Sequence, residues 1–251
     1  MIKFFRHIRR SLINQNKMGK YFKYAFGEII LVVIGILIAL SINNWNENRK
    51  SEKQELILMK QLQTDIISNK NEVKELSKRL RINKIGIDSL ISKLTNQNND
   101  LTVPIYLAQT MRKVDFNSAQ SGYNIMQSGK ASLISDEQVL KTVLNLYEND
   151  LADIMDRQTD MNNSIDYIQK HFINKLFVQA QNNLNIKFKE LDVIATEAFE
   201  PINFDALAEN IEFKNTLFQL GKLVETRLAF LSNTEKELDR TLDVLEFKIE
   251  Q

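Results

Sequence analysis

Apolar residues recur at every seventh position from residue 59 to residue 94 of this chain. A second series, offset by three or four residues, completes one stripe along a helix, which is the pattern of coiled-coil-like packing. A helix over residues 48–97 is then about 75 Å long, at 1.5 Å per residue. The first series is Met59, Ile66, Val73, Leu80, Ile87 and Leu94, and the second is Leu62, Asn69, Leu76, Asn83 and Leu90.

Two later segments continue this rhythm. Residues 136–180 have the same three-and-four spacing of apolar positions, and in residues 205–250 Leu217, Val224 and Leu231 begin another run of sevens. The chain has only 7 Gly and 2 Pro in 251 residues, which disfavours a turn-rich sheet. We therefore predict an all-α fold, in which residues 46–251 form an elongated antiparallel helical bundle joined by shorter pieces.

The connecting segments carry weaker signals. Residues 101–114 and 117–135 predict short helices, and Ser135 with Gln138 has the spacing of a capping box at the start of the second long helix. Residues 182–193 alternate between apolar and polar side chains, a pattern that also fits a short strand.

The polar residues Asn69 and Asn83 interrupt the apolar stripe and predict the register of the bundle. Polar residues in a helical seam commonly specify register at a cost in stability. If the first and third long helices pair antiparallel, the numbers of neighbouring residues add up to about 311. Asn83 then faces the neighbourhood of Arg227, and Asn69 faces that of Thr241.

An apolar run near the N-terminus predicts a membrane anchor over residues 21–45. Twelve consecutive residues, 29–40, have no polar side chain, and flanking apolar residues extend the run to the roughly 20 that a span needs. Trp45 lies where an aromatic belt marks the interface. The alternative is a signal peptide cleaved at Ala39-Leu40-Ser41. The long basic region before the run, and the helix formers after it, favour a retained anchor.

The basic residues predict the orientation of this anchor. Seven Lys or Arg precede the span and four follow it over a comparable length, which favours an N-terminus inside the cytoplasm and residues 46–251 outside it. Residues 1–20 have apolar and basic positions on opposite faces of a short helix, as in a helix that lies on a membrane surface; a disordered basic tail is the alternative.

Two features of the span suggest partners within the membrane. Gly35 and Ala39 form a small-xxx-small pattern that packs two spans together, although Gly is common in membrane helices. Glu28 is the only acid near the bilayer, where a carboxylate suggests a proton relay. Its place at the cytoplasmic edge favours an ordinary interfacial residue.

Catalytic and metal-binding patterns are missing from the sequence. It has no Cys and two widely separated His residues, and no nucleotide-binding or metalloprotease motif occurs. From residue 28 onward the chain has 26 basic and 32 acidic residues. This net negative charge is not typical of a protein that binds nucleic acid. We expect neither an enzyme nor a bound cofactor or metal.

The segment YAFGEIILVVIGILIALSINNWNE, residues 24–47, resembles the start of an uncharacterised family of single-span envelope proteins common in Bacteroidota, a domain of unknown function. Ser128, Gly129, Leu133 and Ile134 match a second pattern of that family. The resemblance implies a Gram-negative inner membrane and a periplasmic bundle, and it implies no activity.

Three functions fit these observations. The first is a non-enzymatic, membrane-anchored scaffold or interaction protein, whose partners are the lipid bilayer and either a second copy or another envelope protein. The second is a sensory or ligand-binding ectodomain that works with a separate membrane partner. The third, which depends mainly on Glu28, is an accessory subunit of an ion-driven membrane complex.

Overall fold

A computed structural model describes residues 18–180, 184–188, 191–195 and 198–250 of the chain. The predicted amphipathic head therefore lies almost wholly outside the described residues. The chain divides into two compact units, Met1–Leu56 and Ile57–Gln251. The fold is all-α, as the sequence predicts, with four short strands.

Helix α2 (Met18–Thr95) contains both the predicted anchor and the first long helix of the bundle. In the part of the chain that the structure describes, α2 is the one helix long and apolar enough to cross a membrane. Its most apolar stretch of 18 residues is 0% buried. Large apolar side chains from Phe26 to Trp45 are exposed along it.

The second long helix is built from three consecutive pieces. These are α5 (Glu137–Asn145), α6 (Leu151–Ile168) and α7 (Asn174–Leu176), which wide π-helical turns join at Leu146–Asp150 and Gln169–Ile173. The capping prediction is wrong by one residue, because the side chain of Asp136, not Ser135, accepts hydrogen bonds from the N–H groups of Gln138 and Val139. A carboxylate is favoured at this place by the positive end of the helix dipole.

The C-terminal helix is divided near its start. The helices are α8 (Phe204–Glu209) and α9 (Ile211–Ile249), with Asn210 between them in an extended conformation. The Asn210 side chain accepts a hydrogen bond from the N–H of Phe213 at 2.9 Å and so caps α9.

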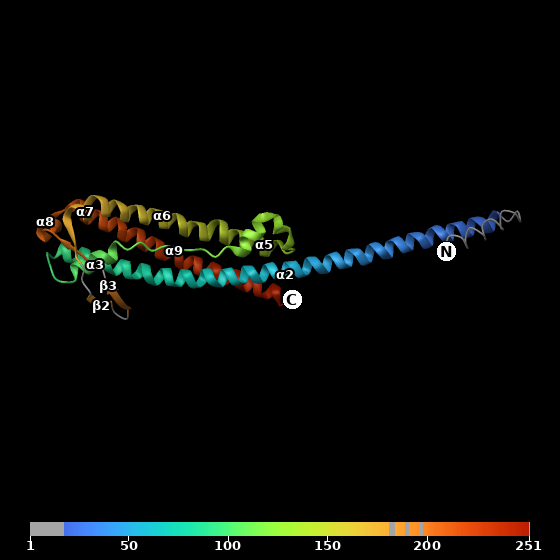
Figure 1. The fold of residues 1–251 in the computed structure, drawn as a ribbon, viewed down its shortest axis with the longest axis horizontal. Helices are drawn as coiled ribbons and strands as arrows, with labels where there is room; N and C mark the ends of the chain where they lie inside the picture. Colours follow the sequence, from blue (N-terminus) through green and yellow to red (C-terminus); the bar gives the residue numbers. More distant parts are fainter. Residues whose placement is uncertain (1–17, 181–183, 189–190, 196–197, 251) are drawn as a thin grey trace. The chain divides into compact units, whose positions relative to one another are not determined.

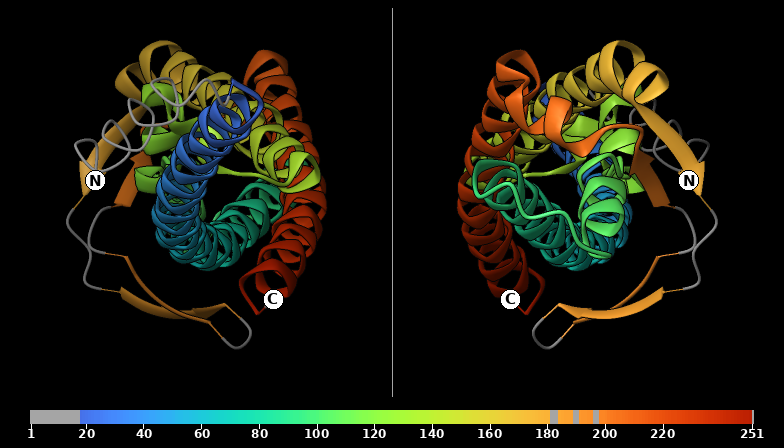
Figure 2. Two further views of the ribbon diagram at one scale, coloured as in Figure 1. Left: turned by 90° about the vertical axis from the view of Figure 1, so that its right-hand side faces the viewer. Right: turned by 90° about the vertical axis from the view of Figure 1, so that its left-hand side faces the viewer.

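An extended segment, residues 112–120, connects the two ends of the bundle, and we call it the strap. It follows α3 (Val103–Thr110) and precedes α4 (Ser121–Ile125). The strap returns along the bundle, so α2 and α6 point the same way and α9 points the opposite way (Figure 1). Viewed along the bundle, the long helices surround this thin segment (Figure 2). A short connection in place of the strap would instead have made the second long helix run antiparallel to α2, in a simple up-down order.

Four strands form a two-part hairpin between α7 and α8. β1 (Phe177–Ala180) pairs antiparallel with β4 (Ala198–Pro201), and β2 (Leu184–Phe188) pairs with β3 (Leu191–Ala195). The expected helix over residues 136–180 is therefore wrong in its last turn, since β1 replaces it. Three residues separate β1 from β2, and two separate β3 from β4. The register of the β2–β3 pair is therefore offset by one residue from the register of the β1–β4 pair.

The core lies along the predicted stripe. All eleven heptad positions of α2 between Met59 and Leu94 are buried, Asn69 and Asn83 included. Five positions of α9 spaced by seven residues are buried opposite them: Leu217, Val224, Leu231, Leu238 and Leu245. Each fully buried aliphatic side chain contributes about 1.5–3 kcal/mol to folding, so burial along this stripe stabilises the bundle.

Candidate functional site

The strap is held at one end by the amide of Asn69. Its Nδ2 donates to the carbonyl oxygen of Ala119 at 2.9 Å, and its Oδ1 accepts from the N–H of the same residue at 2.6 Å. The hydroxyl of Tyr147 on the second long helix also donates to the Ala119 oxygen, at 3.2 Å. One side-chain amide thus replaces the neighbouring strand that an extended backbone otherwise needs.

A second group of polar side chains holds the other half of the strap. Asn83 Nδ2 donates to the carbonyl of Arg112 at 2.8 Å. On α6, Gln158 Oε1 accepts from the N–H of Phe116 at 2.7 Å. On α9, Arg227 Nη1 donates to the carbonyl of Val114 at 3.0 Å. Each of the three long helices therefore supplies a hydrogen bond to the main chain of the strap.

Arg227 is buried without a carboxylate in ion-pair contact among the described residues, and its side chain is 1% exposed. Its Nη2 donates to Gln158 Oε1 at 3.2 Å, so a neutral amide and a carbonyl replace the usual acid. Burial lowers the pKa of the guanidinium to about 10, although Asp115 nearby acts in the opposite direction. The guanidinium thus hydrogen-bonds to the strap and to α6 at the same time.

The predicted register residues bind main-chain groups of the strap. Asn83 and Arg227, expected to lie in the same neighbourhood, hydrogen-bond to strap residues that are two apart. Asn69 binds Ala119, and the Thr241 hydroxyl donates to the carbonyl of Glu237 in its own helix at 2.7 Å. The sequence located the polar positions of the stripe, but it did not identify the main chain that they bind.

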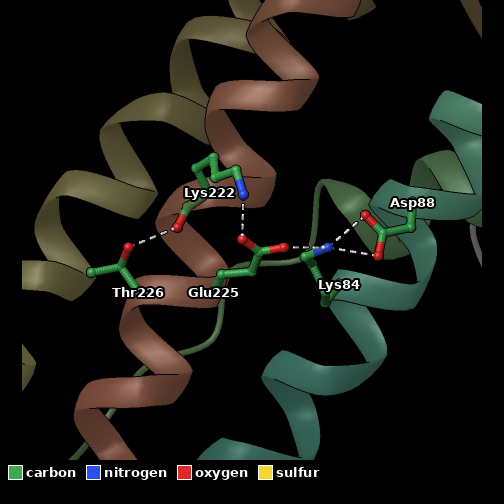
Figure 3. A network of polar contacts seen from close by, with 5 residues as sticks. All are labelled: Lys84, Asp88, Lys222, Glu225 and Thr226. Atoms are coloured by element: carbon green, nitrogen blue, oxygen red, sulfur yellow. Dashed lines mark hydrogen bonds and ion pairs between the residues drawn. The ribbon is translucent and has the colours of Figure 1, made fainter.

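Side-chain contacts between α2 and α9 establish their antiparallel register. Four such pairs have residue numbers that add up to 309, two below the expected sum: Gln63 with Glu246, Lys70 with Asp239, Lys74 with Glu235, and Lys84 with Glu225. In the last pair, Lys84 Nζ lies 2.9 Å from Glu225 and 2.6 Å from Asp88, and Lys222 joins the same network at 2.8 Å (Figure 3). Ion pairs thus follow the α2–α9 seam.

The candidate residues of the span lie along the first part of α2. A Cβ added to Gly35 would meet nothing within 4 Å, so that position is open to a second helix. Trp45 is 64% exposed, and the guanidinium of Arg49 lies 5.8 Å from its ring centroid. Glu28 is half-buried, and Ala39 is exposed on the same helix.

A polar groove of about 510 Å³ lies between α6 and α9, where no ion pair crosses the seam within the described residues. Buried Leu220 lines it, and the Tyr167 hydroxyl crosses it to donate to Glu212 Oε1 at 3.2 Å. The other lining residues are Asn163, Ser164, Asn215, Thr216 and Gln219. Sequence reasoning did not find this groove, because exposed Asn and Gln are ordinary on helix surfaces and nothing in their spacing marks them.

The chemistry available to these residues is hydrogen bonding. Across the described ranges, no group of three or more His, Asp and Glu side chains could hold a metal ion. The groove offers amides, hydroxyls and one carboxylate, which suit a polar ligand better than an apolar one.

Comparison with known proteins gives one match. No curated protein and no solved structure matches the chain. The model of the family of unknown function DUF6090 matches residues 28–202, which include the apolar part of α2, the strap and the second long helix. This match extends over more than half of the sequence, and the chain therefore belongs to the family of unknown function DUF6090.

Proposed function

We propose that this protein is a non-enzymatic scaffold or interaction protein, anchored by residues 21–45 in the inner membrane, with its N-terminus in the cytoplasm and residues 46–251 in the periplasm. The exposed apolar side chains from Phe26 to Trp45 support the anchor, because side chains of this kind are covered by lipid or by another protein. The excess of Lys and Arg before the span supports the orientation.

One observation carries the scaffold role: the buried polar side chains of the bundle bind its own strap. Asn69, Asn83 and Arg227 hold main-chain groups of residues 112–119. A buried polar network whose members bind one another stabilises one arrangement of helices. A bundle held in this way suits a rigid spacer better than a catalyst.

The anchor and its orientation are tested by fusing alkaline phosphatase after Gln251 in a Gram-negative host. Active phosphatase that resists extraction from membranes by alkaline carbonate, together with an intact N-terminus in the mass spectrum, is the expected result. A mature chain that begins near Ser41 would identify a cleaved signal peptide instead.

The partner is tested by crosslinking the full chain in its native membrane and identifying the crosslinked peptides by mass spectrometry. Crosslinks to itself or to one envelope protein are expected. If the crosslinks instead join the span near Glu28 to a multi-spanning ion-translocating protein, the accessory-subunit function replaces the scaffold.

A ligand-binding ectodomain is the second candidate, and the groove between α6 and α9 favours it. Its volume of about 510 Å³ falls in the range of small-molecule sites. Isothermal titration of periplasmic extract fractions of low molecular mass into the purified protein distinguishes this function, since a scaffold gives no saturable heat.

A further inference from the structure

Buried polar atoms that lack a hydrogen-bond partner gather around the strap. Six side-chain nitrogen or oxygen atoms of this kind occur among the described residues. Five of the six belong to the strap itself or to residues that are hydrogen-bonded to it. These five atoms are Asn83 Oδ1, Gln109 Oε1, Ser118 Oγ, Asn162 Oδ1 and Arg227 Nε. The unsatisfied groups of the core therefore lie where the strap runs through it.

Three of these atoms lie beside one short stretch of main chain, residues 109–114. Asn83 donates through Nδ2 to the carbonyl oxygen of Arg112 at 2.8 Å, while its Oδ1 has no partner among the described residues. The N–H of Arg112 in turn donates to the carbonyl oxygen of Gln109 at 3.3 Å. Arg227 Nη1 donates to the carbonyl oxygen of Val114, two residues further along. All three side chains therefore border the junction between α3 and the strap.

The packing of the helices brings these three side chains towards one another. A Cβ added to Gly86 would lie 2.9 Å from Gln109 Cβ, so α3 touches α2 at this point. Gly86 is three residues from Asn83, which places the two on neighbouring turns of one face of α2. The antiparallel register of α2 and α9, which the ion pairs of their seam establish, sets Arg227 beside Asn83. The side chains thus converge from α2, α3 and α9.

Bulk solvent does not reach this place. Asn83 and Arg227 are 1% exposed, and Gln109 is 4% exposed. A buried donor or acceptor without a partner destabilises the folded state, because it gives up its hydrogen bonds to bulk water and gains none in return. Native proteins commonly satisfy such groups with an ordered internal water.

The donors and acceptors at the junction determine which ligand fits. The amide oxygens of Asn83 and Gln109 accept hydrogen bonds, and the Nε–H of Arg227 donates one. A water molecule donates two hydrogen bonds and accepts a third, and about three bonds are typical of an internal water. A cation would lie beside the positive guanidinium and could not accept its proton, and an anion has no proton for the two oxygens. Water therefore matches all three atoms.

We propose that one internal water molecule is bound between Asn83, Gln109 and Arg227, where it donates to Asn83 Oδ1 and Gln109 Oε1 and accepts from Arg227 Nε. The water links α2, α3 and α9 at the start of the strap. It also completes the hydrogen bonding of the buried guanidinium, whose Nη1 and Nη2 bind Val114 and Gln158. This inference goes beyond the proposed scaffold function and is independent of the membrane anchor.

A crystal structure of the full chain, at a resolution that shows ordered waters, tests the site directly. We expect one water peak at hydrogen-bond distance, about 2.5–3.2 Å, from each of the three atoms. Two results would overturn the inference: no peak at the two amide oxygens, or a direct hydrogen bond from Arg227 Nε to one of them.

Nuclear magnetic resonance of the full chain in detergent tests the same water in solution. Rotating-frame spectra of ¹⁵N-labelled protein should show a dipolar cross-peak between water and the Nε–H proton of Arg227, with the sign opposite to that of chemical exchange. Gln109→Met, which replaces the amide by an apolar side chain of similar length, should weaken this cross-peak. The matched control is Gln169→Met, because Gln169 is an exposed glutamine after α6.

The control should keep the wild-type cross-peak, and circular dichroism confirms that both variants are folded. A wild-type spectrum with no dipolar cross-peak contradicts the inference, as does a cross-peak of equal intensity in Gln109→Met or an equal loss in Gln169→Met. If Gln109→Met does not fold, the crystal structure and the wild-type spectrum still decide whether the water is bound.

Discussion

At the level of single residues, the strap depends on side-chain amides for hydrogen bonds that a sheet would otherwise supply. A buried backbone N–H or carbonyl without a partner costs about 1–3 kcal/mol. Ala119 has both of its groups bonded to Asn69. The two buried Asn residues therefore lie in an apolar stripe because an extended main chain passes beside them.

Replacement of Asn69 by Ala should lower the free energy of unfolding by about 1–3 kcal/mol, because the N–H of Ala119 loses its acceptor inside the protein. Urea unfolding followed by circular dichroism in detergent measures the change. Asn71→Ala is the matched control, since Asn71 is an exposed amide on the same helix and should change stability by less than about 0.5 kcal/mol. Equal effects would mean that the strap contact is energetically minor.

The Tyr147 hydroxyl makes stability depend on alkaline pH. Burial raises its pKa well above the ordinary value of 10.0, and the nearby Asp65 acts in the same direction. Because the folded state binds this proton more tightly, the contribution is fully present below pH 10 and is lost as the pH rises further. The loss is at most about 1.4 kcal/mol per pH unit.

Tyr147→Phe should therefore show a shallower decline of melting temperature above pH 10 than the wild type. Thermal unfolding between pH 8 and pH 11 measures how steeply the melting temperature falls with pH on both sides of the ordinary tyrosine pKa of 10.0. Parallel slopes in the two proteins would indicate that Tyr147 ionises without unfolding. The hydrogen bond to Ala119 is a smaller loss, because Asn69 still donates to that oxygen.

At the level of elements, ion pairs define the contact between α2 and α9. Lys222 and Lys84 lower the pKa of Glu225 from 4.5 to about 2 (Figure 3). A carboxyl with a depressed pKa stabilises the fold above its ordinary value, and this stability is lost as the pH falls from 4.5 towards 2.

Glu225→Gln should lower the melting temperature near neutral pH and make it less sensitive to acid, so that variant and wild type converge near pH 2. Thermal unfolding at a series of pH values checks this. Glu52→Gln, at an exposed position of α2 outside the seam, should follow the wild-type curve throughout. A constant gap between Glu225→Gln and the wild type would show that the seam does not titrate in this window.

The contact between α4 and α2 requires a glycine. A Cβ on Gly122 would lie 2.9 Å from the main-chain nitrogen of Leu62 and 3.0 Å from its side chain. Gly122→Ala should therefore destabilise the protein by about 1–3 kcal/mol through overpacking. Gly221→Ala on α9 is the comparison, because its Cβ would meet only a side-chain methyl of Ile87, at 3.3 Å. Chemical denaturation of both variants ranks them; a Gly122→Ala protein as stable as Gly221→Ala would refute the tight contact.

Local patterns predicted the long helices but not the elements between them. Heptad spacing located α2 and α9 because burial of one helical face is visible along a single segment. The strap is different, since its conformation depends on Asn69, Gln158 and Arg227, which are up to 113 residues away in sequence. β1 was missed for the same reason: its partner is β4, whose paired residues are 18 to 24 positions further along the chain. The groove needs two helices at once, so neither helix alone predicts it.

At the level of the whole molecule, every residue of the hydrophobic core that the structure describes comes after residue 57. A fragment of residues 57–251 should therefore fold without the first unit and remain in solution. Circular dichroism and size-exclusion chromatography of the purified fragment test this. Cooperative unfolding of a helical species is expected, whereas a non-cooperative or aggregated fragment would show that the first unit is needed for folding.

The strap also makes the assembly of the bundle depend on the order in which the chain is synthesised. Val114 receives its hydrogen bond from Arg227, which leaves the ribosome 113 residues later, and at 5–20 residues per second the delay is about 6–23 s. During this interval the strap exists while Arg227 of α9, which binds it, is still missing. Until Arg227 is present, the Val114 carbonyl lacks this donor, so the contacts that all three long helices make with the strap are completed only when the last helix arrives.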